Sequence, residues 1–233
     1  MLPVAILAGG VASRLRPVTE KIPKALVEVA GKPFVFHQLE WLRGEGARKV
    51  VLCVGYLGDQ IREVVGHGQQ FGLAVDYSFD GEPLLGTGGA LRKAMHKLGK
   101  DFFVLFGDSY LTCSLQDVER AYFKAGRSAL MTVFKNDGKW DRSNVIFRDG
   151  RILRYDKKKS SSEMQYIDYG LNVLPASVLL APELPDAFDL GDVLTGLSER
   201  GELAGYEVNQ RFYEIGSHDG LKETDEFFSR RRK

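Results

Sequence analysis

The pattern of hydrophobic and polar positions changes its period repeatedly over the first 135 residues. Continuous apolar runs, among them PVAILA, KVVLCVGY and FFVLFGD, alternate with stretches of helical period such as FVFHQLEWLRGEG and GGALRKAMHKLG. Apolar strands separated by helices are typical of a mainly parallel sheet that is covered on both faces. In the helix expected around residues 34–43, Val35, Leu39 and Leu42 share the core-facing side, whereas Gln38 points elsewhere. The pattern predicts an α/β fold, a three-layer α/β/α sandwich around a mainly parallel, Rossmann-like mixed sheet.

The second half of the chain has shorter strand-like pieces and more turn residues. The tetrapeptide RDGR at 148–151 predicts a two-residue hairpin turn. A polar loop, KKKSSSEM, is followed by the strand YIDYGLNVL, a helix near LGDVLTGLSERG, the strand LAGYEV, the strand-like FYEIGS and a last helix from about Ser217. Because neither an internal repeat nor a linker separates the halves, we expect a single domain over residues 1–233, with no further domain after the last helix.

Charge is balanced along the chain, with 32 Lys and Arg against 31 Asp and Glu and a formal net charge of +1. This balance argues against a broad electrostatic footprint for nucleic acid or for an anionic membrane. The only basic run, RRRK at 230–233, is interpreted as a solvated helix end. Cys53 and Cys113 lack disulfide or zinc-site spacing, and no basic segment precedes the apolar N-terminus. We therefore expect a cytoplasmic protein without a signal peptide or a membrane span.

The stretch LAGGVASRLRPVTEKIPKAL, residues 7–26, follows the first apolar strand and is rich in cations. Gly9 and Gly10 would allow a positive φ and a close backbone approach to a phosphate or a base. Arg14 can fork across two phosphate oxygens, and Lys24 can supply a compact charge. Neither the G-x-G-x-x-G pattern of a dinucleotide site nor the lysine of a P-loop is present. The stretch predicts an anion site at the carboxyl edge of the sheet.

Another apolar strand, within LFGDS, delivers Asp108 just beyond its end. A carboxylate at this place is either an Mg²⁺ ligand or the N-cap of the following segment, and the local sequence leaves both open. The remaining cations of the first stretch carry less information. Lys21 is interpreted as surface charge, and Arg16 is left open between the surface and a phosphate contact.

Six segments, in their order and spacing, carry a family resemblance. They are LAGGVASRLRPVTEKIPKALVEVAGKP near the N-terminus, LGTGGAL at 85–91, FGDS at 106–109, YDKK at 155–158, YIDYGL at 166–171 and FYEIGSHDGL at 212–221. Together they resemble the sugar-1-phosphate nucleotidyltransferases (NDP-sugar pyrophosphorylases), most of all the heptose-1-phosphate and mannose-1-phosphate guanylyltransferases. The resemblance implies the nucleotide-diphospho-sugar transferase fold, with a nucleotide-binding half near 1–135 and a sugar-binding half near 136–233. It also implies a reaction in which a heptose or hexose 1-phosphate attacks the α-phosphorus of an NTP, GTP in the first place, for surface-glycan precursor synthesis.

The resemblance further implies roles for individual residues. Arg14 and Lys24 would carry the transfer; Leu7, Ala8, Gly9, Gly10, Glu82 and Gly88 would bind the nucleotide; Gly89, Asn144, Asp156, Lys157, Asp168 and Gly170 would bind the sugar phosphate; Asp108 and Glu214 would hold the metal. The metal is expected to be Mg²⁺, because the ligands are hard oxygens and the substrates bring phosphates. Glu82 suits the N1–H and N2–H edge of guanine, but GEP is equally a plain turn. Asp168 is either a cap or a contact to a sugar hydroxyl.

Four positions depart from the family pattern, one of them Asn144, where many relatives have glycine. Ala12 stands at the third glycine, Ser13 at the threonine, and Glu214 where aspartate is usual. Alanine tolerates a positive φ poorly, so we expect an ordinary conformation at Ala12 or a shifted loop.

Other functions stay open beside this one. UTP, CTP or dTTP with a glucose-type 1-phosphate, phosphocholine cytidylyl transfer, and a catalytically silent NDP-sugar-binding subunit are the alternatives. A metal-dependent glycosyltransferase is disfavoured because GDSY lacks the second aspartate of D-x-D. A homodimer is neither required nor excluded.

Overall fold

The computed structural model describes residues 1–140, 142–159 and 161–231. Its main strands are β1 (Val4–Ala8), β4 (Lys49–Val54), β5 (Ala74–Phe79), β6 (Asp101–Phe106), β8 (Ala129–Lys135), β9 (Val145–Arg148), β10 (Arg151–Tyr155), β11 (Tyr166–Pro175) and β12 (Leu203–Val208). In the described part of the chain they form one sheet in the order β5-β4-β1-β6-β11-β8-β12-β10-β9. Neighbours from β5 to β6 are parallel, as are β8 and β12, whereas β11 is antiparallel to both β6 and β8. The predicted mixed sheet is confirmed.

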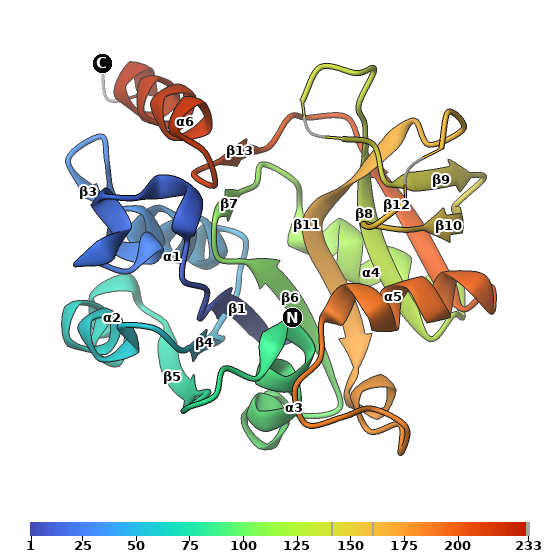
Figure 1. Ribbon diagram of the computed structural model, residues 1–233, viewed down its shortest axis with the longest axis horizontal. Helices are drawn as coiled ribbons and strands as arrows, with labels where there is room; N and C mark the ends of the chain where they lie inside the picture. The colour runs from blue at the N-terminus through green and yellow to red at the C-terminus, as the bar shows by residue number, and fades with distance from the viewer. Residues whose placement is uncertain (141, 160, 232–233) are drawn as a thin grey trace.

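Helices cover both faces of this sheet (Figure 1). They are α1 (Phe34–Gly44), α2 (Gly58–Val65), α3 (Gly86–Leu98), α4 (Leu115–Ala125), α5 (Leu190–Glu199) and α6 (His218–Arg231). Buried residues of α1, α2 and α4 pack with Val4 and Ile6 of β1, while those of α3 and α5 pack on the other side with Ala5. Successive strand residues point to opposite faces, so β1 is apolar throughout because both faces are covered. The predicted three-layer sandwich is confirmed.

Most of the short elements lie near the cation-rich stretch that follows β1. The 3-10 turns η1 (Ser13–Leu15), η2 (Val18–Glu20) and η3 (Lys24–Leu26) follow β1, and η4 (Gln69–Phe71) and η5 (Ala176–Leu179) lie elsewhere. Two small antiparallel sheets pair β2 (Glu28–Val29) with β3 (Lys32–Pro33) and β7 (Ser109–Tyr110) with β13 (Tyr213–Glu214). The helix α6 packs beside both pairs through a separate apolar cluster that includes Val29, Tyr110 and Phe227.

Two local predictions have different outcomes. The hairpin is confirmed, since β9 and β10 are joined by Asp149 and Gly150 with φ of 50° and 74°, the positive values that a tight hairpin turn requires. The interpretation of α1 was wrong for Gln38, which is 0% exposed. Its amide binds backbone carbonyls under the sheet edge, so a polar residue occupies a buried helix position.

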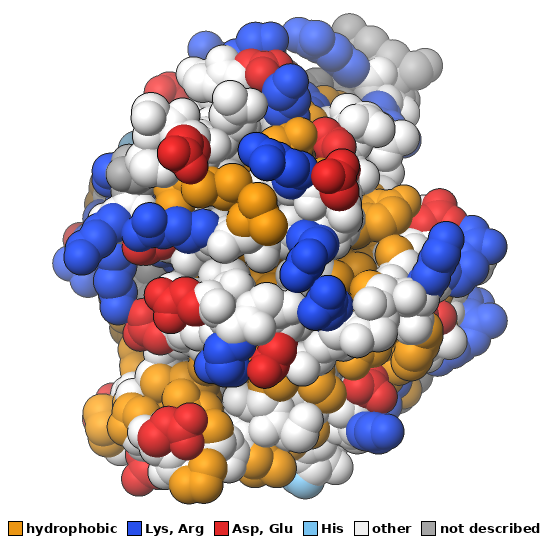
Figure 2. All heavy atoms as spheres, turned by 90° about the vertical axis from the view of Figure 1, so that its right-hand side faces the viewer, with side chains coloured by type: hydrophobic (Ala, Val, Ile, Leu, Met, Phe, Trp, Pro, Cys, Tyr) orange, Lys and Arg blue, Asp and Glu red, His pale blue; other side chains and the backbone are white. Residues whose placement is uncertain are grey.

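The surface carries charges of both signs. On the face formed by the β9 and β10 side of the sheet, Figure 2 shows Lys and Arg side chains intermingled with Asp and Glu. No helix in the described ranges combines the length and the apolar character needed to cross a membrane. Of the basic run RRRK, residues 232 and 233 lie outside the described residues.

Candidate functional site

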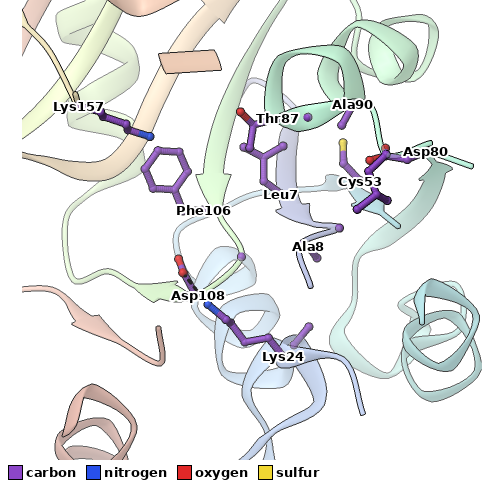
Figure 3. A pocket seen from close by; sticks show the side chains of 16 residues that line it. Leu7, Ala8, Lys24, Cys53, Asp80, Thr87, Ala90, Phe106, Asp108 and Lys157 are labelled. Atoms are coloured by element: carbon purple, nitrogen blue, oxygen red, sulfur yellow. Dashed lines mark hydrogen bonds and ion pairs between the residues drawn. The ribbon is translucent and has the colours of Figure 1, made fainter. Parts of the chain in front are cut away.

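A cavity of about 330 Å³ opens where β1 and β6 end. Of the residues predicted from the sequence, seven line it: Leu7, Ala8, Gly9, Gly10, Lys24, Asp108 and Lys157. Figure 3 shows Asp80 and Cys53 on one side, Lys157 on the opposite side, and Lys24 meeting Asp108 at a third place. The cavity therefore occupies the carboxyl ends of parallel strands, where open α/β sheets bind their ligands.

Lys24 and Asp108 form the charged centre of this cavity. Lys24 begins η3 directly after Pro23, and its Nζ donates to Asp108 Oδ2 at 3.0 Å. The two side chains are 18% and 33% exposed, so the pair is partly shielded from water but still accessible. Asp108 lies in the turn between β6 and β7 rather than ahead of a helix, which excludes the N-cap interpretation. The pairing also aims Lys24 into the cavity.

The loop after β1 keeps its shape through Ala12. Neither Gly9 nor Gly10 has a positive φ; Ala12 does, at 51°, so the expectations for the two glycines and for the alanine were wrong. A Cβ on Gly9 would lie 3.1 Å from the backbone nitrogen of Gly55, which makes close packing the reason for that glycine. Thr19 Oγ1 donates to the carbonyl of Ala12 at 2.8 Å and holds the left-handed residue in place. The loop thus reaches Arg14 without the expected third glycine.

Glu214 lies beside Asp108 but is bound to the start of α6. Its Oε1 accepts from Ser217 Oγ at 2.7 Å, and its Oε2 accepts from the backbone N–H of Gly216. An ideal Cβ on Gly216 would lie 2.6 Å from Glu214 Oε2, 3.4 Å from Asp108 Oδ2 and 3.5 Å from Arg14 Nη2. The two carboxylate oxygens can therefore be no further apart than the sum of the first two distances, about 6 Å. Two carboxylates and a guanidinium converge on a space that glycine leaves free.

This convergence suits a hard divalent cation. Carboxylate oxygens are the donors that Mg²⁺ prefers, and Mg²⁺ usually takes one or two carboxylates while water and substrate phosphates complete its shell. Within the described ranges, no group of three or more His, Cys, Asp or Glu side chains gathers in a metal-binding arrangement. Asp108 and Glu214 thus fit a metal that is shared with phosphates, and their role as ligands stays a prediction.

Asp80 is a charged cavity-lining residue that the sequence analysis missed. It is 8% exposed, and its Oδ1 is buried without a hydrogen-bond partner among the described residues. Burial raises the pKa of this carboxyl, against the opposing effects of the Leu85 backbone N–H and the Lys93 charge. Glu82, predicted for this role, lies on the exposed turn that follows and is not among the cavity-lining residues. A signal existed, because Asp80 directly follows the end of β5, as Asp108 follows the end of β6 two residues on.

Cys53, next to Asp80, is not a nucleophile. The thiol is 1% exposed, and burial, together with the nearby Asp80 charge, raises its pKa to about 12. A thiol with such a pKa stays protonated at neutral pH, so Cys53 acts as a small apolar wall.

Gly88 and Gly89 have a packing role in the protein itself. Their backbone N–H groups both donate to the carbonyl of Phe188, at 2.9 and 3.3 Å. A Cβ on Gly88 would overlap the Phe188 ring, and one on Gly89 would lie 2.7 Å from the carbonyl oxygen of Asp186. Both glycines are thus needed for packing segment 181–189 against α3, and their amides are occupied within the protein. Thr87, one residue earlier, lines the cavity, and its backbone N–H does not donate to the Phe188 carbonyl.

Lys157 marks the second end of the cavity. Its Nζ lies 5.0 Å from the centroid of the Phe106 ring, within cation–π distance. Asp168 lies behind it, with a pKa that burial raises and that the Lys157 charge opposes. Gly170, in the bulge of β11, has φ of 98°, and a Cβ there would lie 3.5 Å from Phe106. Lys157 is therefore placed by an aromatic ring and a carboxylate.

The other predicted sugar-side residues support this end without lining the cavity. Asp156 Oδ1 accepts from the backbone N–H groups of Lys158 and Lys159, both at 2.8 Å, and these bonds lower its pKa. Asn144 Oδ1 accepts from the backbone N–H of Asp168 at 3.1 Å. Asp168 Oδ1 in turn accepts from the N–H of Gly170 at 3.0 Å, which is the capping alternative for this residue. Lys21 and Arg16 are both exposed.

Comparisons with known proteins agree on one family. The profile of the family described as Nucleotidyl transferase matches residues 4–230. The chain is similar to the mannose-1-phosphate guanylyltransferase catalytic subunit beta of Danio rerio, with 30% identity over 217 residues that cover 91% of this chain and 60% of that protein. The mannose-1-phosphate guanyltransferase of Aspergillus oryzae is 29% identical over 218 residues, again 60% of its length. The chain thus spans about three fifths of the curated relatives that it matches.

Solved structures agree on the fold. HddC from Yersinia pseudotuberculosis, in a crystal structure complexed with GMP-PN, superposes with a TM-score of 0.80 at 27% identity, covering 98% of this chain and 100% of that one. A Bacillus anthracis structure in complex with sucrose superposes with a TM-score of 0.86 at 20% identity, covering 98% and 96% of the two chains.

Proposed function

Because the chain belongs to the nucleotidyl transferase family, we propose that it transfers a nucleotidyl group from a nucleoside triphosphate to a sugar 1-phosphate and releases pyrophosphate. The observation that carries the proposal is the meeting of Lys24, Asp108, Glu214 and Arg14 at one edge of a cavity whose other two ends hold Asp80 and Lys157. Three separate ends match the three parts of such a reaction: a polyphosphate, a base and a sugar phosphate.

The reaction joins two polyanions, so positioning and charge neutralisation matter more than proton transfer. A phosphate oxygen of the sugar 1-phosphate attacks the α-phosphorus in line. The new P–O bond forms, the bond between the α-phosphorus and the α–β bridging oxygen breaks, and that oxygen leaves with pyrophosphate and keeps the electron pair. Arg14 is exposed at the rim and can fork across two phosphate oxygens. Lys24, aimed into the cavity by Asp108, supplies compact positive charge at the reacting phosphate. Lys157 binds the attacking sugar phosphate from the opposite side.

Asp108 and Glu214 would hold Mg²⁺ in this scheme. The metal, when bound, supplies charge neutralisation on the phosphates. Gly216 leaves the space between the two carboxylates and Arg14 open, and Ser217 orients Glu214 through its hydroxyl.

GTP is the nucleotide that Asp80 favours. Its buried carboxylate has an unpartnered oxygen, and burial of an unpaired charge is costly. Guanine presents two donors, N1–H and the N2 amino group, which would satisfy an ionised carboxylate, whereas uracil and thymine present one donor between two acceptors. Relatives named as guanylyltransferases and a neighbour complexed with GMP-PN support the same choice. For the sugar, we propose a hexose 1-phosphate of the mannose type or a heptose 1-phosphate, used for surface-glycan precursors.

The silent-subunit alternative loses one of its supports. Ala12 adopts the left-handed conformation that a glycine readily takes, which favours a loop that still presents Arg14 to the cavity.

A pyrophosphate-release screen tests the proposal. ATP, GTP, CTP and UTP are each crossed with mannose, heptose and glucose 1-phosphates and with phosphocholine, with Mg²⁺ present. We expect release with GTP and a mannose-type or heptose substrate, and none after addition of a chelator. Release with another base would overturn the role of Asp80, and no release with any pair would overturn the proposed activity.

A further inference from the structure

Gln38 lies in α1, fully buried beneath the turn that joins β6 to β7. Its Nε2 lies 3.1 Å from the carbonyl oxygen of Phe106 and 2.8 Å from that of Ser109. Both partners are acceptors, so only the amino end of the side chain can serve them. The two N–H bonds hold the backbone on either side of Gly107 and Asp108.

The same turn is held from its other side by β13. The backbone N–H of Ile215 donates to the carbonyl of Asp108 at 2.9 Å, next to the pairing of Glu214 with Ser109. Three carbonyls around Asp108 are therefore hydrogen-bonded: those of Phe106 and Ser109 by Gln38, and that of Asp108 itself by Ile215.

The residue before Gln38 performs a related task for the segment that carries Lys24. His37 Nε2 lies 2.9 Å from the carbonyl oxygen of Val29, in the hairpin that follows η3. Neighbouring side chains of one helix therefore bind the two segments whose Lys24 and Asp108 pair at 3.0 Å. The helix α1 therefore holds both segments, and with them Lys24 and Asp108, in a fixed relative position.

The environment of Gln38 is not the one that stability alone would favour. Its Oε1 is buried and has no hydrogen-bond partner among the described residues, which is a cost. An apolar side chain would avoid this cost but would leave two carbonyls of the turn unpaired.

We infer that Gln38 is a positioning residue for Asp108: its amide fixes the turn so that the carboxylate faces Lys24 and Glu214. This inference rests on the proposed function. Misplacement of a reacting or metal-binding group by about 1 Å costs on the order of a hundredfold in rate. A turn released on one side allows displacements of that size without unfolding the sheet.

The experiment compares Gln38→Met, similar in shape but without donors, with Tyr122→Phe as a matched control. Tyr122 Oη donates to Asp101 Oδ1 at 2.8 Å, at the opposite end of β6, so its loss removes a partly buried hydrogen bond far from the turn. The dissociation constant of Mn²⁺, used as a paramagnetic probe without sugar 1-phosphate, and the kcat and KM of pyrophosphate release are measured for each protein.

For Gln38→Met we expect a Mn²⁺ dissociation constant raised about tenfold or more and kcat lowered at least as much, with both KM values changed less than about threefold. Tyr122→Phe should keep wild-type values of all of them. Gln38→Asn, which is one methylene too short to reach both carbonyls, should give an intermediate loss and serves as the second variant should Gln38→Met not fold.

Wild-type Mn²⁺ affinity and kcat in both Gln38 variants would overturn the positioning role, as would losses equal to those of Tyr122→Phe. Failure of the proposed function has a different signature. The wild-type protein would then release no pyrophosphate from any substrate pair, while the Mn²⁺ measurement would still decide whether Gln38 positions Asp108.

Discussion

Replacing Gly220 by alanine tests whether Glu214 is held where the structure places it. The Glu214 carboxylate folds back over the first turn of α6, where Ser217 Oγ and the Gly216 N–H donate to its two oxygens. A Cβ on Gly220 would overlap Oε1 and Cδ of Glu214 and would lie 2.8 Å from the Glu214 carbonyl oxygen. An alanine at this position therefore expels the carboxylate from its site.

The magnitude follows from the interactions that are lost. Hydrogen bonds to charged groups contribute about 1.5–3 kcal/mol each when buried. Because Glu214 is only partly buried, the two together are worth about 2–3 kcal/mol after allowance for solvent screening. Alanine in place of glycine returns about 0.5–1 kcal/mol in a helix. The free energy of unfolding should thus fall by about 1–2 kcal/mol, since the loss exceeds the gain.

Shortening the acid changes this result. In a Glu214→Asp background the overlap with the side chain disappears, and only the tight backbone contact at 2.8 Å remains. This backbone contact is common to both backgrounds, so Gly220→Ala should cost about 2–3 kcal/mol less in the Glu214→Asp protein than in the wild type, and this difference, the contribution of the two hydrogen bonds, is the coupling energy between the two positions.

Urea unfolding of the four proteins of this cycle, with a common m-value, measures the coupling. A parallel Mn²⁺ titration should show weaker binding for Gly220→Ala than for the double variant. Additive effects of the two substitutions within about 0.5 kcal/mol would refute the docking of Glu214 on α6.

Three further predictions concern other parts of the site. Ala12→Gly should stabilise the protein by about 0.5–1 kcal/mol, because alanine is strained at φ of 51°, with turnover unchanged; a lower urea midpoint would contradict this. Lys157→Ala should raise the KM for sugar 1-phosphate far more than that for NTP, and equal changes would place Lys157 on the triphosphate instead. Asp80→Asn should gain stability relative to the wild type as pH rises from about 4 to about 7: folding raises the pKa of Asp80, so the folded state holds the extra proton and loses stability as pH rises through that pKa. A pH-independent difference in melting temperature would show that Asp80 does not titrate in this range.

The main sheet could be predicted from the sequence because each of its buried strands has a recognisable local pattern. A strand covered on both faces reads as a continuous apolar run, as β1 does throughout and β6 does after its first residue, Asp101, and each is followed by a turn. The position of β11 between β6 and β8 could not be predicted from such a local pattern. It depends on the pairing of Leu171 with Leu105 and of Asn172 with Met131, contacts between distant segments that no local period encodes.

The site divides in the same way. Lys24 and Asp108 were predicted because each follows an apolar strand or a glycine turn in a short motif. Gln38 was assigned to a polar helix face, since helical periodicity registers polarity but not the carbonyls of a turn 68 residues away. The packing of Gly88 against the ring of Phe188, one hundred residues later in the chain, was not predicted either. The local sequence thus identified the charged residues Lys24 and Asp108. It missed the contacts of Gln38 and Gly88, whose partners are distant in the chain.

The distance between Asp108 and Glu214 in the sequence has a structural consequence of its own. They meet through the two-stranded pairing of β7 with β13, which lies outside the main sheet, so its geometry depends on what packs behind it. That support is α6: Phe227 stacks on Tyr213 at 3.8 Å between ring centroids, and Asp225 Oδ1 accepts from the N–H of Ala30 at 2.6 Å, in the hairpin after Lys24. The helix thus fixes the strand that carries one carboxylate and the segment that carries the lysine, while α1 fixes the turn that carries the other carboxylate. If all three side chains stood on one rigid sheet edge, neither helix would be needed to position them. Because Lys24, Asp108 and Glu214 come from three separate segments, both α1 and α6 are needed to hold them together.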